Sequence, residues 1–135
     1  MIRNVKILVL LVTFVYVFAY GSEVYNDIGV YDFNFNWKFI LRSVSGAEEP
    51  DYDDSDWENI DLPHDWSIYH EFDSNLEGCT GYLPGGVGWY RKEFTLNIDT
   101  VSTKVFILFD GVYNNSKFWI NGKYLGEHIY GYSPF

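Results

Sequence analysis

Hydrophobic and polar residues alternate one by one in two segments of the chain, which is the pattern of a half-buried β-strand. Residues 90 to 96 place charged and polar side chains opposite a stripe that is apolar except for Lys92. No stretch after residue 22 has the periodicity of a helix. The pattern therefore predicts an all-β domain of antiparallel strands. In the other segment, residues 33 to 41, the residues that share one face are Phe33, Phe35, Trp37, Phe39 and Leu41.

Two further segments support the β prediction. The apolar run from Lys104 to Phe109 is followed by an Asp-Gly pair, which predicts a central strand buried on both faces. Asn121-Gly122 lies between two apolar runs, and this dipeptide supplies the two positive φ angles of a type I′ hairpin. Short strands separated by turns indicate a β-sandwich of the jelly-roll type. Residues 131 to 135 end on an aromatic just after the hairpin, so we expect the sandwich to be incomplete at the C-terminus.

Two loops and one cysteine complete the outline of the domain. Residues 51 to 61 are acidic and rich in turn formers, and we expect Trp57 to anchor this loop in the core. The five glycines of residues 78 to 88 predict a tightly turned or flexible crossing near the surface. Cys79 is expected to be buried as a small hydrophobic residue, and we assign it no chemistry.

The N-terminus has the features of a secretory signal peptide. Arg3 and Lys6 precede 13 uncharged residues, and small residues flank Tyr20 at the positions that specify cleavage. The alternative is a transmembrane anchor, but the run is shorter than the roughly 20 residues that a membrane-spanning helix needs. We expect residues 1–21 to be a signal peptide cut after Gly21 and residues 22–135 to be the mature domain. The predicted location is secreted or periplasmic, with no membrane span after cleavage.

Composition and charge exclude several classes of protein. Nine Lys and Arg against 19 Asp and Glu give a formal charge of -10, which argues against a nucleic-acid partner. Loss of residues 1–21 would remove two positive charges and make the mature domain more acidic. The hydrophobic share of 47% and the aromatic share of 21% are too high for a disordered chain, and a single cysteine excludes a disulfide scaffold.

The sequence carries no recognisable catalytic or metal-binding motif. No Gly-x-Ser-x-Gly elbow is present, and His64, His70 and His128 lack the spacing of zinc ligands. The acidic run of residues 48 to 56 lacks the glycine and the closing glutamate of a calcium loop, so we expect a solvated loop. We therefore expect no catalytic residue, no metal and no cofactor in this chain.

Sugar binding is the chemistry that the residue types favour. Sugars present apolar C–H faces and hydroxyl rims, which flat aromatic rings beside carboxylates, amides and imidazoles can bind. Such residues gather in three loops, residues 62 to 68, 78 to 88 and 128 to 132. Aromatic residues of a β-sandwich more often belong to the core, and we expect Trp66 and Trp89 to pack internally.

Several motifs in a consistent order carry a family resemblance that covers the chain from about Phe35 to Phe135. They are Leu62 to Ile68 (LPHDWSI), Gly81 to Lys92 (GYLPGGVGWYRK), Asp110 to Val112, Trp119 to Gly122, Gly126 and Gly131-Tyr132. Together they resemble the N-terminal sugar-binding domain of glycoside hydrolase family 2, and within it the secreted bacterial β-galactosidases.

The resemblance implies a galactose-binding-like jelly roll that packs against an immunoglobulin-like domain and a TIM barrel of the same polypeptide. In this family both catalytic glutamates belong to the barrel and act with retention. The first domain lends loop residues to the rim of the sugar pocket. In some members one of them is an Asp shortly after the Asn-Gly hairpin, a position that Tyr130 occupies here. The resemblance therefore implies that His64, Asp65, Tyr130 and Tyr132 lie on the substrate-binding side.

The sequence thus indicates part of a secreted, retaining glycosidase that hydrolyses terminal β-linked sugars. The partners that this reading implies are a β-linked sugar or oligosaccharide and the immunoglobulin-like and TIM-barrel domains. One alternative is a stand-alone carbohydrate-binding module without hydrolytic activity. Another is an interaction domain that docks to the barrel and contacts no sugar. For His64 and Asp65, the alternative to sugar contact is a buried hydrogen bond between adjacent loops.

Overall fold

The computed structural model describes residues 3–11, 24–25, 29–97 and 103–135 of the chain, and these residues form an all-β structure. The only helical segments in this part of the chain are two short 3-10 turns, so the predicted fold class is confirmed. The strands are β1 (Arg3–Leu11), β2 (Val24–Tyr25), β3 (Trp37–Leu41), β4 (Glu58–Ile60), β5 (Gly88–Leu96), β6 (Ser116–Ile120) and β7 (Lys123–His128). The 3-10 turns are η1 (Trp66–Tyr69) and η2 (Gly78–Thr80).

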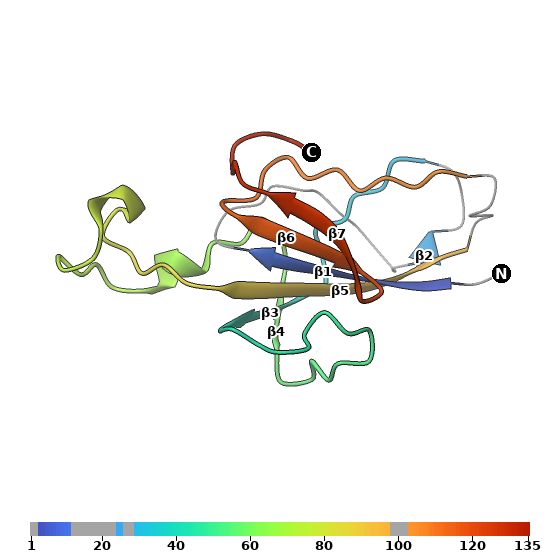
Figure 1. Cartoon of the computed structure of the whole chain (residues 1–135), viewed down its shortest axis with the longest axis horizontal. Helices are drawn as coiled ribbons and strands as arrows, with labels where there is room; N and C mark the ends of the chain where they lie inside the picture. Colours follow the sequence, from blue (N-terminus) through green and yellow to red (C-terminus); the bar gives the residue numbers. More distant parts are fainter. Residues whose placement is uncertain (1–2, 12–23, 26–28, 98–102) are drawn as a thin grey trace.

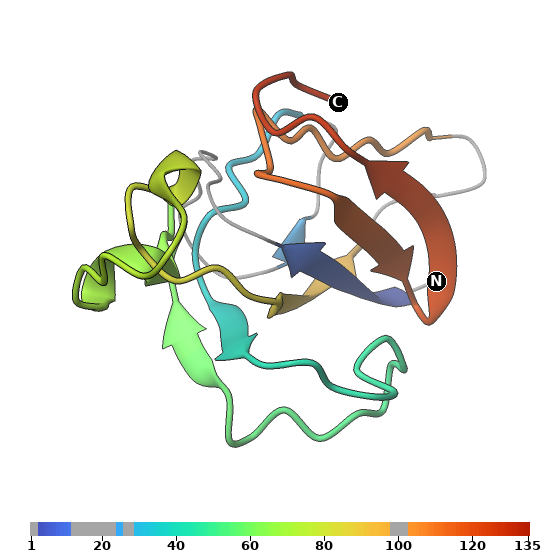
Figure 2. The ribbon, with the colours of Figure 1, turned by 60° about the vertical axis from the view of Figure 1, so that its left-hand side comes forward.

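The described strands form one sheet in the order β4-β3-β5-β1-β6-β7. Neighbours along this order are antiparallel, and β2 pairs in parallel with β5 outside the series. Figures 1 and 2 both show β1 between β5 and β6, at the centre of the sheet. The segment that the sequence assigns to a signal peptide thus contributes the central strand of this structure. The jelly-roll order of strands remains a prediction.

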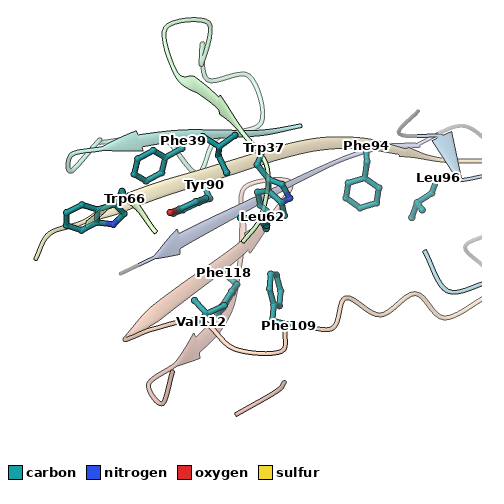
Figure 3. Close-up of a cluster of buried hydrophobic side chains, with 11 residues drawn as sticks. Trp37, Phe39, Leu62, Trp66, Tyr90, Phe94, Leu96, Phe109, Val112 and Phe118 are labelled. Carbon is teal, nitrogen blue, oxygen red and sulfur yellow. The ribbon is translucent and has the colours of Figure 1, made fainter. Parts of the chain in front are cut away.

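The core lies on both faces of β5 because its side chains alternate between two clusters. One face carries Tyr90 and Phe94, which pack with buried residues of β3, β6 and the 109–112 segment. Figure 3 shows these side chains pointing toward Phe109 and Phe118 across the core. The other face carries Trp89, which packs with Ala47 and Trp57 of the loop between β3 and β4.

The alternation predicted for residues 33 to 41 holds only from Trp37 onward. Asn36 has a φ of 56°, a left-handed conformation that breaks the extended backbone before β3 begins. The alternation therefore does not continue through the residues before the break: Asn34, which it would place opposite the apolar face, is buried. The Asn34 backbone oxygen accepts a hydrogen bond from the Leu62 backbone N–H at 2.8 Å. Leu41, at the end of the strand, is partly exposed.

The prediction of a buried central strand over Lys104 to Phe109 is wrong for this structure. This segment forms no strand, and Val105, Phe106 and Leu108 are 45%, 85% and 63% exposed. Only Phe109 is buried, and it exchanges two backbone hydrogen bonds of 3.0 Å with Phe135. The physical reason is that an apolar run forms a buried strand only where it has neighbours on both sides, and β1 occupies the central place of the sheet.

The hairpin prediction is confirmed, and the prediction for the cysteine is wrong. Asn121 and Gly122 have φ angles of 50° and 76°, as a type I′ turn requires, and they join β6 to β7. Cys79 is exposed, because η2 lies on a surface loop that offers it no core to pack against. Trp57 is buried, as expected of an anchor of the acidic loop. Among the described residues, no helix is long and apolar enough to cross a membrane.

Candidate functional site

The strand directions bring two of the three predicted loops to one end of the sheet. Because β5, β1, β6 and β7 are successively antiparallel, β5 begins at the edge where β7 ends. Residues 66 to 87, which we call the arm, precede β5, and residues 129 to 135 follow β7. Figure 1 shows both segments at the left-hand end of the sheet, with the arm extending beyond it. The candidate site is built at this end.

The side chain of His64 is buried in the core against residues of β3 and β5 and does not face solvent. Its Nδ1 atom lies 2.8 Å from the Tyr90 hydroxyl oxygen, and its ring packs edge-on against Phe39 with centroids 4.7 Å apart. Burial lowers the pKa of His64, while the carboxylates of Glu58 and Asp65 act in the opposite direction. Burial also raises the pKa of the Tyr90 phenol, so its hydroxyl stays protonated and can donate to a neutral imidazole.

Asp65 holds the turn that carries the next residues of the arm. Its Oδ1 atom accepts hydrogen bonds from the Ser67 backbone N–H at 3.0 Å and from the Ser67 hydroxyl at 2.6 Å, which caps η1. The turn directs Trp66 into the core, where a methyl group added to Gly86 would lie 3.6 Å from the indole ring. Tyr69, at the end of η1, is exposed. Asp65 thereby fixes η1, whose Trp66 ring packs beside Gly86 just before β5.

Tyr130 and Tyr132 are exposed after β7, with ring centroids 5.8 Å apart in an edge-to-face arrangement. Between them, Gly131 contacts another loop so closely that an added Cβ would lie 2.6 Å from the Tyr113 Cα atom. The Tyr113 ring packs against Tyr132 with a centroid separation of 5.4 Å. The Gly-Tyr motif therefore allows two backbones to touch and holds Tyr132 against a neighbouring ring.

The structure divides the predicted site residues into two kinds. His64 and Asp65 are buried in hydrogen bonds within the domain, whereas Tyr130 and Tyr132 face outward. Within the part of the chain that the structure describes, no hydrogen bond or ring contact joins the two pairs. The arm and residues 129 to 135 together form an exposed apolar and aromatic surface at one end of the sheet. On the arm and after β7, the exposed residues are Ile68, Tyr69, Phe72, Tyr82, Val87, Ile129, Tyr130 and Tyr132.

Arg91 makes contacts that the sequence did not predict. The alternation placed it only among the polar residues opposite the apolar stripe. It is buried, and its Nε atom donates to Asp54 Oδ2 at 2.8 Å. Its Nη1 atom donates to the backbone carbonyls of Ala47 and Glu49. The guanidinium also lies 5.6 Å from the Tyr52 ring centroid. The sequence contains both an arginine in this strand and an acidic loop. Only the fold shows that the arginine pairs with that loop.

Lys92, the exception in the apolar stripe, also has a structural explanation. Its ammonium group donates to the Phe35 backbone oxygen at 2.6 Å and lies 5.0 Å from the Phe33 ring centroid. The aliphatic part of the Lys92 side chain thus lies in the core cluster, while these two contacts stabilise its charged end. Among the residues described, no group of three or more His, Cys, Asp or Glu side chains is arranged to hold a metal ion.

Comparison with known proteins identifies the class of enzyme to which this structure is related. No protein-family model matches the chain. The chain is 46% identical over 106 residues to a β-galactosidase, BoGH2A, of Bacteroides ovatus. It is 44% identical over 108 residues to a putative β-glucuronidase of Formosa agariphila. Each match covers 77% of this chain but only 12% and 10% of the respective relatives.

A solved structure leads to the same class. A β-glycosidase from Bacteroides vulgatus superimposes with a TM-score of 0.66 and is 45% identical, over 76% of this chain and 14% of that protein. The chain is therefore related to the β-glycosidases, and it spans only a small part of the length of the relatives that it matches. Its resemblance to glycosidases of family 2 is confirmed, with relatives named as β-galactosidases and β-glucuronidases.

Proposed function

We propose that this chain is the sugar-binding domain of a larger, secreted glycosidase of the β-galactosidase type. The observation that carries the proposal is the identity of 46% to a β-galactosidase over 77% of the chain. Hydrolysis with retention needs two carboxyl groups about 5 to 5.5 Å apart, and we assign both to another part of the longer polypeptide. The role of this domain is then to contribute to sugar binding beside the catalytic domain.

The exposed rings at one end of the sheet support a sugar-binding role. Tyr69 on the arm and Tyr130 and Tyr132 after β7 are exposed, and the two segments that carry them lie at the same end of the sheet (Figure 1). Such rings pack against the C–H faces of a pyranose, and their hydroxyl groups can form hydrogen bonds with its rim. We propose that Tyr130 and Tyr132 contact a β-linked sugar directly. The burial of His64 and Asp65 supports a positioning role for them, exerted through η1.

A chimeric enzyme tests this proposal. Residues 35 to 135 of this chain would replace the matching segment of the Bacteroides ovatus β-galactosidase, and the kinetics on a chromogenic galactoside would be measured. We expect Tyr132→Ala to raise KM by about tenfold, since loss of one packed aromatic contact costs roughly 1 to 1.5 kcal/mol. Tyr124→Ala is the matched control, because Tyr124 is an exposed tyrosine near the start of β7, at the other end of that strand from Tyr130 and Tyr132. Equal kinetics of the two variants would contradict sugar contact.

The same experiments distinguish the two alternatives. A stand-alone carbohydrate-binding module would bind galactose with a Kd in the millimolar range or tighter in calorimetry on the chain by itself. A domain that only docks to the catalytic part would give unchanged kinetics but a lower Tm for Asp65→Asn and Tyr132→Ala in the chimera. Turnover of the chromogenic galactoside by the purified chain alone would overturn the assignment of catalysis to another domain.

Export is the second component of the proposal. Two basic residues, an uncharged apolar run and small residues around Tyr20 support a cleavable signal peptide. We propose that the mature protein begins at Ser22 and is secreted or periplasmic. Mass spectrometry of the protein recovered outside the cytoplasmic membrane should give an N-terminus at Ser22. A protein that retains Met1 at that location would overturn cleavage.

A further inference from the structure

The loop after β7, residues 129 to 135, is closed by contacts of the residue just before it. The His128 Nε2 atom lies 3.1 Å from the Ser133 hydroxyl oxygen, within hydrogen-bond distance. The same imidazole ring stacks on the Phe135 ring, with centroids 4.0 Å apart and an interplanar angle of 20°. One side chain at the end of β7 therefore joins the start of this loop to its far end.

His128 is itself held at a fixed place on the sheet. It is the last residue of β7 and pairs with Ser116 of β6. Ser116 is fully buried, and its hydroxyl donates a hydrogen bond to the His128 backbone oxygen at 3.0 Å. The next carbonyl oxygen, that of Ile129, accepts a hydrogen bond from the Asn115 backbone N–H at 3.2 Å. The imidazole is therefore attached to a strand end whose backbone is fixed, which a positioning group needs.

The far end of the loop is fixed to the core. The Phe135 ring stacks on Phe109 with centroids 5.2 Å apart and contacts Phe118 edge-on at 4.9 Å. Phe109 and Phe135 also exchange two backbone hydrogen bonds of 3.0 Å. Figures 1 and 2 show residues 129 to 135 turning back beside the segment that contains Phe109. Both ends of the loop are thus anchored, and Ser133 lies just before the second anchor.

Tyr132 is 74% exposed, so its orientation depends on the backbone that carries it and on the neighbouring rings. Its ring centroid lies 5.4 Å from that of Tyr113 and 5.8 Å from that of Tyr130. Ser133 follows it directly, so the hydrogen bond to His128 acts one residue away from this ring. A ring that is already held loses less conformational entropy when it binds a ligand than a mobile ring does. The contact between His128 and Ser133 therefore favours binding by Tyr132.

We propose that His128 is a positioning residue for Tyr132: by binding Ser133, it holds the Tyr132 ring in the orientation that contacts sugar. The inference rests on the proposed function, because it requires that Tyr132 contacts a β-linked sugar. His128 acts through the loop, since Phe135 covers its ring and Ser133 binds its Nε2 atom. Its effect belongs to KM rather than kcat, because the reacting carboxyl groups are assigned to another part of the longer polypeptide.

The first test follows the loop in the full chain without sugar. His128→Gln and His128→Asn both remove the ring that stacks on Phe135. Only the longer glutamine side chain brings an amide to the position of the Nε2 atom, where it can bind the Ser133 hydroxyl. Nuclear Overhauser contacts between the Tyr113 and Tyr132 rings report the orientation of Tyr132. We expect His128→Gln to keep these contacts and His128→Asn to weaken them at least about twofold. Equal contacts in the two variants would overturn the proposal.

The second test measures kinetics in the chimeric enzyme that contains residues 35 to 135 of this chain. We expect His128→Asn to raise KM for the chromogenic galactoside about fivefold at unchanged kcat, as the loss of one hydrogen bond would. His128→Gln should restore KM to within about twofold of the parent. In a Tyr132→Ala background, His128→Asn should add less than about twofold, because the ring on which it acts is absent. A full fivefold effect in that background, or a lower kcat, would overturn the proposal.

Ser133→Ala keeps the test decisive if a substitution of His128 prevents folding. It removes the same hydrogen bond from a partly exposed side chain and leaves the stacked rings in place. It should raise KM about as much as His128→Asn, and the two together should raise it no more than His128→Asn alone. Additive effects would overturn a role for this hydrogen bond.

The outcomes separate this proposal from the proposed function. If Tyr132→Ala raises KM and His128→Asn does not, sugar contact is upheld and only the role of His128 is overturned. If Tyr132→Ala leaves KM unchanged, sugar contact by Tyr132 is overturned. The ring contacts in the full chain then still decide whether His128 holds the loop, because that measurement uses no sugar.

Discussion

Arg91 connects the central part of the sheet to the acidic loop between β3 and β4. Its guanidinium satisfies a carboxylate and several backbone carbonyl oxygens at once, beside the Tyr52 and Trp57 rings. The planar fork of an arginine suits this role, whereas a lysine has a single charged centre. The acidic loop is therefore held in place at one point, although most of its carboxylates face solvent.

Replacement of Arg91 should reveal this contact. Arg91→Met would leave the Asp54 carboxylate and the Ala47 and Glu49 carbonyls without their donor, so we expect a loss of about 3 kcal/mol in the free energy of unfolding. The matched control is Arg42→Met, whose pairing with Asp56 is exposed and should contribute less than about 1 kcal/mol. Urea denaturation followed by tryptophan fluorescence measures both, and equal losses would contradict the assignment.

His64 should make the stability of the domain depend on pH. Its pKa is lowered in the folded state by burial, so below about pH 6.5 the unfolded chain binds a proton that the folded chain excludes. The contribution of His64 to the free energy of unfolding is therefore complete above this pH. It is lost as the pH drops toward the pKa of His64 in the folded state. We expect His64→Asn to show a shallower loss between pH 7 and pH 5 in urea denaturation. His70→Asn, at an exposed position, is the control, and equal slopes for the two variants would disprove the role of His64.

At the scale of elements, local patterns identified those strands and turns whose structure depends on near neighbours in the sequence. The stripe on β5 and the Asn-Gly turn between β6 and β7 follow directly from alternation and backbone preference. The start of β3 was missed because it depends on the left-handed backbone of Asn36, which alternation does not encode. The structure of Lys104 to Phe109 was missed because an apolar run does not specify which strands lie beside it.

The β6–β7 hairpin offers a test of backbone strain. Gly122 has a φ of 76°, and an added Cβ would lie 3.2 Å from the Pro50 Cδ atom. We expect Gly122→Ala to lower the free energy of unfolding by about 1 kcal/mol or somewhat more. Gly85→Ala is the matched control, since nothing lies within 4 Å of its added Cβ and its φ is not in the left-handed region. Thermal denaturation should show a lower Tm for Gly122→Ala only.

At the scale of the whole molecule, the sequence indicated candidate site residues but not which of them are buried and which are exposed. The motif that contains His64 and Asp65 was identified, yet their burial depends on Tyr90 of β5 and on the cap of η1. The grouping of the arm with Tyr130 and Tyr132 depends on the directions of four strands, one of which was assigned to the signal peptide. Such long-range arrangements are set by tertiary packing, which a local pattern does not contain.

The exposed apolar side chains between β5 and β6 should limit the solubility of the chain by itself. Phe106 is 85% exposed, whereas its neighbour Ile107 packs against the core cluster. We expect Phe106→Glu to raise the concentration at which aggregates appear in light scattering, with little change in Tm. Ile107→Glu, which adds the same charge at the next residue, should instead lower the Tm. A lower Tm for Phe106→Glu would show that this side chain contributes to the fold.

The position of Cys79 has a practical consequence. The sequence contains one cysteine, and its thiol is exposed on the arm, at the end of the sheet that carries the candidate site. A maleimide fluorophore will therefore label each molecule once and at a known place, without any substitution. Because the label lies outside the core, its emission can report whether a ligand or a partner covers that end of the sheet.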